Sequence, residues 1–302
     1  MIRVLKPGLL TTIQDLGRPG FAHLGVSPSG AADRFSLRLA NLLVGNPENA
    51  PAIECTLLGP VLQFESKATI AITGSTTSTQ LPLNQSVEVS SGLRLEVGSL
   101  LSGARTYIAI RGGIDVPEVM KSASTLLPAG IGGFQGRNLR AADVLQFGEC
   151  QTVAPRRLVN RSNFKQPSEG PIRVTETTQS DWFSAPTLLQ FQSSTFRVSD
   201  ESNRSGIRLQ GEPVLADCRT ELLTEGVSLG GIQIPSDGQP IILFVDQQTT
   251  GGYPKIAKIV AADLSRVAQL RPRDELKFQF VTFAEAVYLL RQQEQALREA
   301  FE

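Results

Sequence analysis

Short apolar runs separated by turns recur along most of this chain, and they constrain its fold more than any other feature. Residues 68–73, 107–110 and 241–245 are such runs, and each is followed by glycine or by polar residues. The 27 glycines and 18 prolines supply frequent breaks, which disfavour long helices over most of the chain. The pattern predicts a mainly β fold with few helices. Further strands are expected at 172–175, 196–198 and 276–281.

Residues 86–89 and 93–97 alternate on either side of a Ser-Ser-Gly turn and are expected to form a hairpin. Two segments predict helices. In residues 33–44 the apolar side chains fall on one helical face, and Gly45 follows as a cap. The C-terminal helix is expected to begin at Thr282, which forms a capping-box pattern with Glu285.

A faint internal repeat indicates two related β domains. Residues 139–147 and 270–278 agree at five of nine positions, and both combine a polar turn with an alternating strand. The polar stretch 155–171 is the expected boundary. We therefore expect an N-terminal β domain at 1–158 and a C-terminal one at 170–302, which ends in the helix.

Charge and cysteine content exclude several classes of function. Lys+Arg and Asp+Glu number 29 each, so there is no basic excess for nucleic acid or for an anionic membrane surface. No apolar stretch approaches the length of a membrane span. The three cysteines lie far apart without a C-x-x-C spacing, so no metal site and a reduced, cytoplasmic location are expected.

The segment from Gln247 to Lys255 has the composition of a small-molecule site at a strand end. It follows the run 241–245 and carries two glycines, two threonines, a tyrosine and a lysine. Glycines allow close backbone approach, and the other side chains offer donors to an anionic or carbonyl group. The alternative is a tight turn whose glycines serve only the backbone. Lys255 is the candidate for chemistry, as a base of lowered pKa or as a charged donor to an oxyanion, with Asp246 as a second catalytic candidate.

Further polar residues beside glycines are candidate substrate contacts. Asp15 and Arg18 could pair and fix their loop, and Arg137 could bind a carboxylate through two hydrogen bonds. The full set of expected substrate-binding residues is Gln14, Asp15, Arg18, Ser29, Arg111, Arg137, Gln233, Gln248, Thr249, Thr250, Gly251, Gly252 and Tyr253.

Two familiar motifs are incomplete and two others are absent. Residues 226–230 match the G-x-S-x-G pattern, but an expected strand follows where a nucleophile elbow needs a helix. Met120-Lys121 resembles half of a biotin attachment site, yet Ser122 stands where the second methionine belongs. There is no phosphate loop and no dinucleotide-binding fingerprint.

Six segments in this order resemble one family. They are Thr12–Arg18, Ser29–Asp33, Ala40–Asn46, Arg111–Asp115, Pro235–Pro240 and Thr249–Ala257. Together they resemble the carboxyltransferase-domain family of biotin-dependent urea carboxylase, also called allophanate hydrolase subunit 2. The stand-alone bacterial members of that family are the C subunits of ATP-dependent 5-oxoprolinase, formerly described as antagonists of a kinase inhibitor. The resemblance spans about residues 3–282.

This resemblance implies two cyclophilin-like β-barrel domains and a hydrolase that opens the lactam of 5-oxo-L-proline to L-glutamate. It implies partners, the B and A subunits of 5-oxoprolinase, with ATP bound with or by those partners. One alternative is a carboxyltransferase acting on urea or another amide with a separate biotin carrier, the only case that needs biotin. Another alternative is a non-catalytic regulatory protein that binds a kinase-inhibitor-like partner.

Three positions depart from the family pattern. Ala32 replaces a methionine, Ala123 replaces an arginine, and Ser205 replaces the methionine of a Met-Gly-Tyr-Arg pattern. The loss of an arginine removes an expected anion contact. These changes put the identity of the lactam or amide substrate in question more than the fold.

Overall fold

The computed structural model describes residues 1–148, 170–217 and 222–301. These residues form two compact units. The first comprises the described residues of Met1–Pro19, Ser29–Phe164 and Leu297–Glu302, and the second those of Gly20–Pro28 and Lys165–Ala296. The predicted boundary stretch lies almost wholly outside the described residues, so the domain limits stay a prediction.

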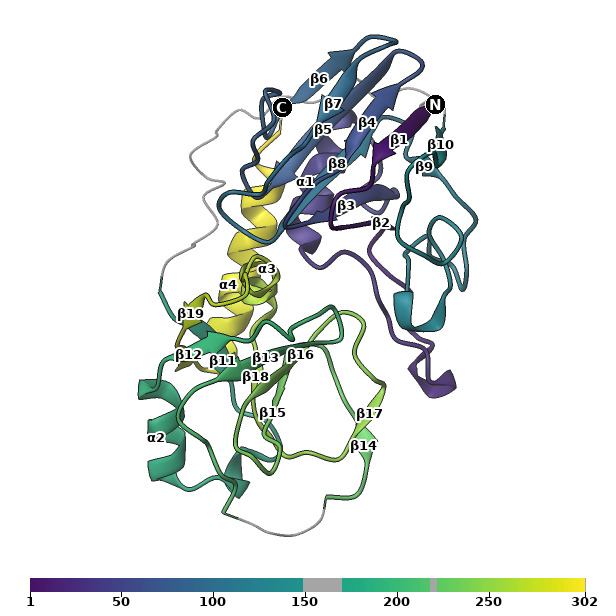
Figure 1. The fold of residues 1–302 in the computed structure, drawn as a ribbon. Helices are drawn as coiled ribbons and strands as arrows, with labels where there is room; N and C mark the ends of the chain where they lie inside the picture. Colours follow the sequence, from purple (N-terminus) through teal and green to yellow (C-terminus); the bar gives the residue numbers. More distant parts are fainter. Residues whose placement is uncertain (149–169, 218–221, 302) are drawn as a thin grey trace. The chain divides into compact units, whose positions relative to one another are not determined.

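The first unit consists of two antiparallel sheets and one long helix (Figure 1). One sheet has the order β7 (Arg94–Glu96), β4 (Val61–Phe64), β1 (Ile2–Lys6), β10 (Val144–Phe147), β9 (Ile114–Asp115). The other has the order β2 (Leu10–Gln14), β3 (Ala52–Thr56), β8 (Arg105–Ile110), β5 (Ala68–Gly74), β6 (Ser86–Val89).

Strand β8 shows how alternation builds the core of this unit. Ile108 and Ile110 belong to a buried cluster that gathers apolar side chains from both sheets. Tyr107 and Ala109 point to the other face, where they pack with α1 (Arg34–Val44). Because successive side chains of a strand point to opposite faces, β8 contributes both to the core between the two sheets and to the packing against α1.

Helix α1 begins and ends as the sequence predicts. The Asp33 side chain accepts a hydrogen bond from the backbone N–H of Ser36, and Gly45 ends the helix with a φ of 77°. An Asp cap satisfies a helix donor, and glycine adopts the left-handed conformation without a Cβ clash.

The second unit is dominated by one eight-stranded sheet. Its order is β19 (Glu275–Leu276), β12 (Phe196–Val198), β13 (Gly206–Gln210), β16 (Ile241–Leu243), β15 (Gly231–Gln233), β18 (Lys255–Ile259), β11 (Ile172–Thr175), β20 (Phe278–Phe280). The two end strands are neighbours in sequence, separated only by Lys277, so the sheet curls into a nearly closed barrel. The same unit also contains a two-stranded antiparallel sheet of β14 (Glu225–Gly226) and β17 (Thr250–Gly251).

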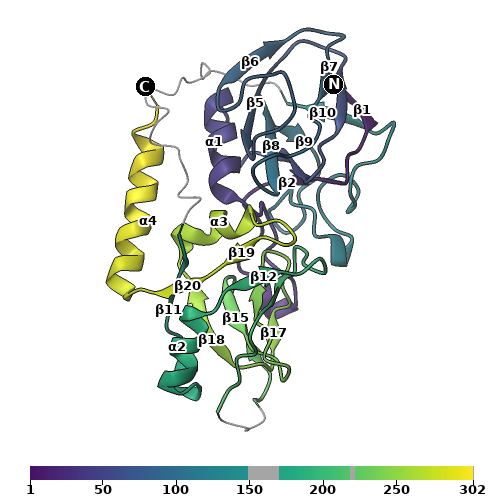
Figure 2. The same cartoon turned by 60° about the vertical axis from the view of Figure 1, so that its left-hand side comes forward.

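Aromatic packing fixes α2 (Ala185–Ser193) to this barrel. The ring of Phe191 stacks on that of Phe278 with centroids 4.6 Å apart, and Phe196 lies tilted against both. The remaining helices are α3 (Leu264–Ala268), α4 (Phe283–Arg298) and the short turns η1 (Ala22–Leu24), η2 (Leu127–Ala129), η4 (Ser180–Trp182) and η5 (Ala261–Asp263). Figure 2 shows α4 from a second side.

The capping box of α4 is confirmed, since the N–H groups of Thr282 and Glu285 each bind the other residue's side chain. None of the helices in the described part of the chain combines the length and apolar character that a membrane span needs.

The predicted internal repeat corresponds to the same turn conformation in both units. In the first unit the Arg140 N–H donates to Asp143 Oδ2 at 2.7 Å, and Ala142 adopts a φ of 71°. The Ala142 N–H then donates to the carbonyl of Val4 on β1 at 2.8 Å.

The second unit repeats each of these contacts. The Arg271 N–H donates to Asp274 Oδ2 at 2.8 Å, and Arg273 adopts a φ of 75°. The Arg273 N–H donates to the carbonyl of Val198 on β12 at 2.8 Å. The repeated sequence therefore forms the same turn in both units. Its third residue, Ala142 or Arg273, is left-handed, and the side chain of its aspartate accepts a hydrogen bond from the first residue of the turn.

Two details of the strand prediction are wrong. Residues 86–89 and 93–97 do not form a hairpin, because β6 pairs with β5 whereas β7 pairs with β4 in the other sheet. The turn before Leu93 exists, but it carries the chain from one sheet to the next. The run 276–281 is divided at Lys277, where the chain passes from one end of the barrel sheet to the other.

Candidate functional site

Asp15 is buried in the first unit and organises the segment 122–124. Its carboxylate accepts hydrogen bonds from the Ser122 hydroxyl and the Ala123 N–H, each at 2.7 Å, and from the Ser124 hydroxyl. The Gly17 N–H donates to the same carboxylate at 2.7 Å. Bonds to a charged acceptor are among the stronger ones, so Asp15 fixes this segment firmly.

Arg18 holds the other side of the same segment. It is 1% exposed, and its guanidinium donates to the carbonyls of Val119 and Ser124. Between these anchors lies a tight turn in which Met120 and Lys121 adopt φ values of 53° and 62°. Two successive left-handed residues other than glycine are unusual and need support from their surroundings. Arg18 and Asp15 provide that support, and Lys121 stands exposed at the turn.

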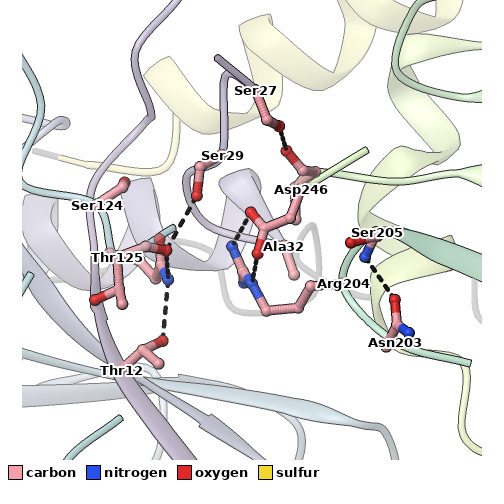
Figure 3. Close-up of polar contacts among 12 residues, drawn as sticks. Thr12, Ser27, Ser29, Ala32, Ser124, Thr125, Asn203, Arg204, Ser205 and Asp246 are labelled. Carbon is pink, nitrogen blue, oxygen red and sulfur yellow. Dashed lines mark hydrogen bonds and ion pairs between the residues drawn. The ribbon is translucent and has the colours of Figure 1, made fainter. Parts of the chain in front are cut away.

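The Ser29 hydroxyl donates to the carbonyl of Thr125 (Figure 3). Gln14 Nε2 donates to the same carbonyl. Gln14 Nε2 also donates to the Thr12 hydroxyl, whereas its Oε1 is buried without a hydrogen-bond partner among the described residues. Reversing the amide would set its oxygen against the Thr125 carbonyl, so the contacts fix the orientation. Ser29 has a φ of 54°, a third left-handed residue other than glycine in this cluster.

The two remaining candidates of the first unit lie in other contacts. Arg137 binds a carboxylate through two hydrogen bonds of 2.8 Å, but the carboxylate is that of Asp143 in the same chain. Arg137 lowers the pKa of Asp143 by this hydrogen bonding. Arg111 is half-buried, and its backbone N–H donates to the carbonyl of Thr69 at 2.9 Å. Substrate contacts for both arginines stay predictions.

In the second unit, Asp246 forms a buried ion pair with Arg204 (Figure 3). The guanidinium donates to both carboxylate oxygens, at 2.8 and 3.1 Å, and the Arg204 and Asp246 side chains are 5% and 1% exposed. The Asp246 N–H also donates to the Arg204 carbonyl. Such a pair is tolerated in the interior only with good geometry, which two parallel hydrogen bonds provide.

Lys255 lies at the other end of the loop, at the start of β18. Its side chain is 11% exposed, and its ammonium pairs with Glu225, which is 44% exposed. Gln179 completes the group, since its Nε2 donates to Glu225 Oε1 at 2.6 Å and its Oε1 accepts from the Lys255 N–H at 2.9 Å. The hydrogen bond from Lys255 lowers the pKa of Glu225. An ammonium has three donors, so Lys255 can hold Glu225 and a ligand oxygen together.

The loop between Asp246 and Lys255 is shaped by its contacts within the second unit. Gly251 and Thr250 pair with Glu225 and Gly226 across β14 and β17. Gln233 is buried, and its Nε2 lies 3.4 Å from the Tyr253 carbonyl. A Cβ on Gly251 would come within 2.6 Å of that same Nε2, so glycine permits the close approach.

The other predicted loop residues are more open to solvent. Gln248, Thr250, Gly252 and Tyr253 are exposed, whereas Thr249 is half-buried. The backbone carbonyl of Thr249 accepts a hydrogen bond from the Val227 N–H at 3.1 Å. The structure thus brings Gln233, Gly251 and Tyr253 together, and it leaves the Gln248 side chain on the surface.

Gln247 lies in the predicted loop but is not among the predicted substrate contacts, and sequence reasoning missed Glu225, Gln179 and Arg204. Gln247 is 4% exposed and its Oε1 has no hydrogen-bond partner among the described residues. A buried acceptor without a donor costs about 1–3 kcal/mol, which marks the position as unusual. Gln247 and Gln248 are adjacent, and nothing in the sequence indicates which of the two is buried.

The three departures from the family pattern lie in packed backbone. Ala123 is 1% exposed and donates its N–H to Asp15, and Ala32 donates its N–H to the buried Glu54. Ser205 donates its N–H to Asn203 Oδ1 at 2.8 Å, and its carbonyl accepts from the Phe244 N–H. The described residues hold no group of three or more His, Cys, Asp or Glu side chains suited to a metal ion.

Two β units with polar, glycine-rich loops match a known class of domain. The family described as carboxyltransferase domain, subdomain A and B, matches residues 24–280, and the chain belongs to this family. Within it, the chain is 39% identical over 293 residues to the 5-oxoprolinase C subunit of Escherichia coli (strain K12), covering 95% of this chain and 93% of that protein.

Two further comparisons place the chain among its relatives. It is 36% identical to the 5-oxoprolinase C subunit of Haemophilus influenzae, over 97% of this chain and 96% of that protein. The crystal structure of K. lactis urea amidolyase matches with a TM-score of 0.93 at 33% identity, covering 98% of this chain and 20% of that one. The predicted family is thereby confirmed.

Proposed function

We propose that this chain is the C-type member of an ATP-dependent 5-oxoprolinase complex, which opens the lactam of 5-oxoproline to glutamate. The observation that carries the proposal is the 39% identity to the 5-oxoprolinase C subunit of Escherichia coli across nearly the full length of both chains. Similarity of this extent covers both units and the loop from Asp246 to Lys255.

Opening of a lactam requires a site that recognises a planar amide. A lactam resists water because resonance stabilises the amide, and phosphorylation of its oxygen makes the carbon open to attack by water. A first water adds to this carbon and the C–N bond breaks, which leaves an amine and an acyl phosphate. A second water then cleaves the acyl phosphate to a carboxylate and free phosphate. ATP is bound with or by the partner proteins in this proposal, since the chain has no phosphate loop.

Lys255 is the residue that we assign to the substrate in this chain. Its ammonium, held by Glu225 at the end of the loop, has donors left for a carbonyl oxygen or a carboxylate. Asp246 has a positioning role in this proposal, because both of its carboxylate oxygens face Arg204. A proton-transfer role for Asp246 stays a prediction.

The partners in this proposal are the A and B subunits of 5-oxoprolinase, and the compartment is the cytoplasm. We also assign the finer fold, two cyclophilin-like β-barrel domains. The duplicated turn closed by Asp143 in one unit and by Asp274 in the other supports a common origin of the two units.

A biotin-dependent carboxyltransferase is the second candidate, favoured by the likeness to urea amidolyase. In that case the same loop would hold urea or another amide, and a separate carrier would supply biotin.

The test is ATP-dependent glutamate release from 5-oxoproline by this chain purified with its partner proteins, with each chain omitted in turn. Release that requires this chain and is unaffected by avidin supports the proposal. Loss of release on adding avidin favours the carboxyltransferase. Full release without this chain would overturn a catalytic role and leave a regulatory one.

A further inference from the structure

The side-chain amide of Gln247 is a recognition group without a partner among the described residues. Its Oε1 is buried and accepts no hydrogen bond from them. Nor does its Nε2 donate to a described residue, for the contacts of Gln247 there are made by its backbone. Among the described residues, this glutamine, 4% exposed, therefore has a buried acceptor without a donor and an Nε2 group that makes no hydrogen bond.

The backbone around Gln247 is held rigidly on several sides. The Gln247 N–H donates to the Phe244 carbonyl at 3.0 Å, and the Phe244 N–H donates to the Ser205 carbonyl at 3.0 Å. The preceding residue, Asp246, is fixed by its ion pair with Arg204. The Ser27 hydroxyl donates to the Val245 carbonyl at 3.0 Å. A side chain on such a backbone is preorganised for binding.

The geometry of a primary amide defines what it binds through both atoms. Oε1 and the Nε2 hydrogens lie side by side, so their complement is a group with an N–H and a C=O on the same side. A small-ring lactam has this cis arrangement, because the ring forces it, and urea has it as well. A trans secondary amide points its N–H and C=O in opposite directions and cannot make both bonds.

Gln14 provides a useful contrast. It is also buried, and its Oε1 likewise has no partner among the described residues, but its Nε2 already donates to Thr12 and Thr125. Of these two glutamines, Gln247 alone has both halves of its amide available within the part of the chain that the structure describes.

We propose that Gln247 reads the cis-amide edge of the substrate, with its Oε1 accepting the lactam N–H and its Nε2 donating to the lactam carbonyl. The assignment of a lactam rests on the proposed function. The wider class, cis-amides that include γ-lactams and urea, rests on the Gln247 amide alone.

The experiment uses the complex of this chain with its partner proteins and two neutral probes, 2-pyrrolidinone and N-methyl-2-pyrrolidinone. The second probe lacks the N–H but keeps the ring and the carbonyl. Binding is measured by saturation-transfer NMR and by competition with 5-oxoproline. The variants are Gln247→Met and Gln247→Glu, with Gln210→Glu as the matched control on an exposed strand position of the same unit.

We expect the wild-type complex to bind 2-pyrrolidinone about tenfold more tightly than the N-methyl probe, as loss of one buried hydrogen bond implies. Gln247→Met should abolish this preference and raise KM for 5-oxoproline about tenfold, whereas Gln247→Glu, which keeps an acceptor for the N–H but loses the donor to the carbonyl, should retain the preference. Gln210→Glu should behave as wild type. A general loss of structure would weaken both probes alike, so the preference between them isolates recognition of the N–H.

Equal binding of the two probes by wild type, no binding of either, or a preference that survives in folded Gln247→Met would overturn the inference. Normal glutamate release with any of these results leaves the proposed function standing. Absent glutamate release with an N–H preference that depends on Gln247 would instead reject the proposed function and keep the cis-amide site.

Discussion

Arg204 and Asp246 form a buried pair in which the guanidinium donates two hydrogen bonds to the carboxylate, of 2.8 and 3.1 Å. The pair joins the segment before β13 to the end of the strand that carries the candidate loop. Removing one member leaves the other as an uncompensated charge in the interior, which is the costliest outcome for such a pair.

Asp246→Asn should lower the free energy of unfolding of the second unit by about 3 kcal/mol or more, because Arg204 stays buried without a counterion. Urea denaturation followed by the fluorescence of Trp182, the one tryptophan of the chain, measures this. Asp200→Asn is the control, since its pair with Arg273 is 64–69% exposed and is expected to contribute less than about 1 kcal/mol. Equal losses in both variants would contradict the buried-pair account.

Lys255→Ala should reduce glutamate release about 100-fold in the assembled complex, because a charged donor to the substrate oxygen is lost. Lys258 lies on the same strand but is exposed, so Lys258→Ala controls for loss of a lysine from β18. Pull-down of the partner proteins should be unchanged in both variants. Full turnover in Lys255→Ala would show that the ammonium has no part in the chemistry.

Glu225 should contribute to stability in a pH-dependent way. Its pKa is lowered from 4.5 by the hydrogen bond from Lys255, so the folded state favours the carboxylate. The stabilisation is therefore complete above the unfolded pKa and is lost as the pH falls through the lowered folded pKa. The difference in unfolding free energy between wild type and Glu225→Gln should shrink as the pH is taken below 4.5. Trp182 fluorescence measures it, and a difference that stays constant through this pH range would contradict the account.

Gly132→Ala should damage the turn that Arg18 supports. Gly132 has a φ of 70°, and an added Cβ would lie 2.0 Å from the Ser124 carbonyl and 2.7 Å from the Arg18 guanidinium. Gly130 has a similar φ of 64° but open space around the Cβ position. Gly130→Ala should therefore cost only about 1–2 kcal/mol for the left-handed backbone, and Gly132→Ala clearly more. Hydrogen exchange of the amides in 119–125 distinguishes the two, and equal protection would refute the clash.

The strand and helix positions were predictable where local signals agreed. The apolar runs at 172–175 and 196–198 became β11 and β12, and Asp33 with Gly45 set the ends of α1. Pairing was harder, because the alternation of 86–89 and 93–97 says that each is a strand but not which neighbour it joins. The turn between them was recognisable, and its role in changing sheets was not.

The site was predictable as a loop but not as a set of contacts. Lys255 and its loop were visible from composition, whereas Glu225 and Gln179 lie 30 and 76 residues away from Lys255 and meet it only through the fold. The sequence alone does not distinguish the roles of Gln247 and Gln248. Burial separates them, and burial depends on which side of the strand end faces the interior.

The single residue between β19 and β20 has a consequence for synthesis of the protein on the ribosome. Ile172 pairs with Phe278 in parallel register, so one seam of the barrel needs a strand made more than a hundred residues later. The pairing of β12 with β19, in which Phe196 lies opposite Leu276, also cannot form until these late residues have been made. Until residue 280 has left the exit tunnel, both outer strands of the emerging sheet keep unpaired backbone groups, and a chaperone that shields nascent β-edges would act within that interval.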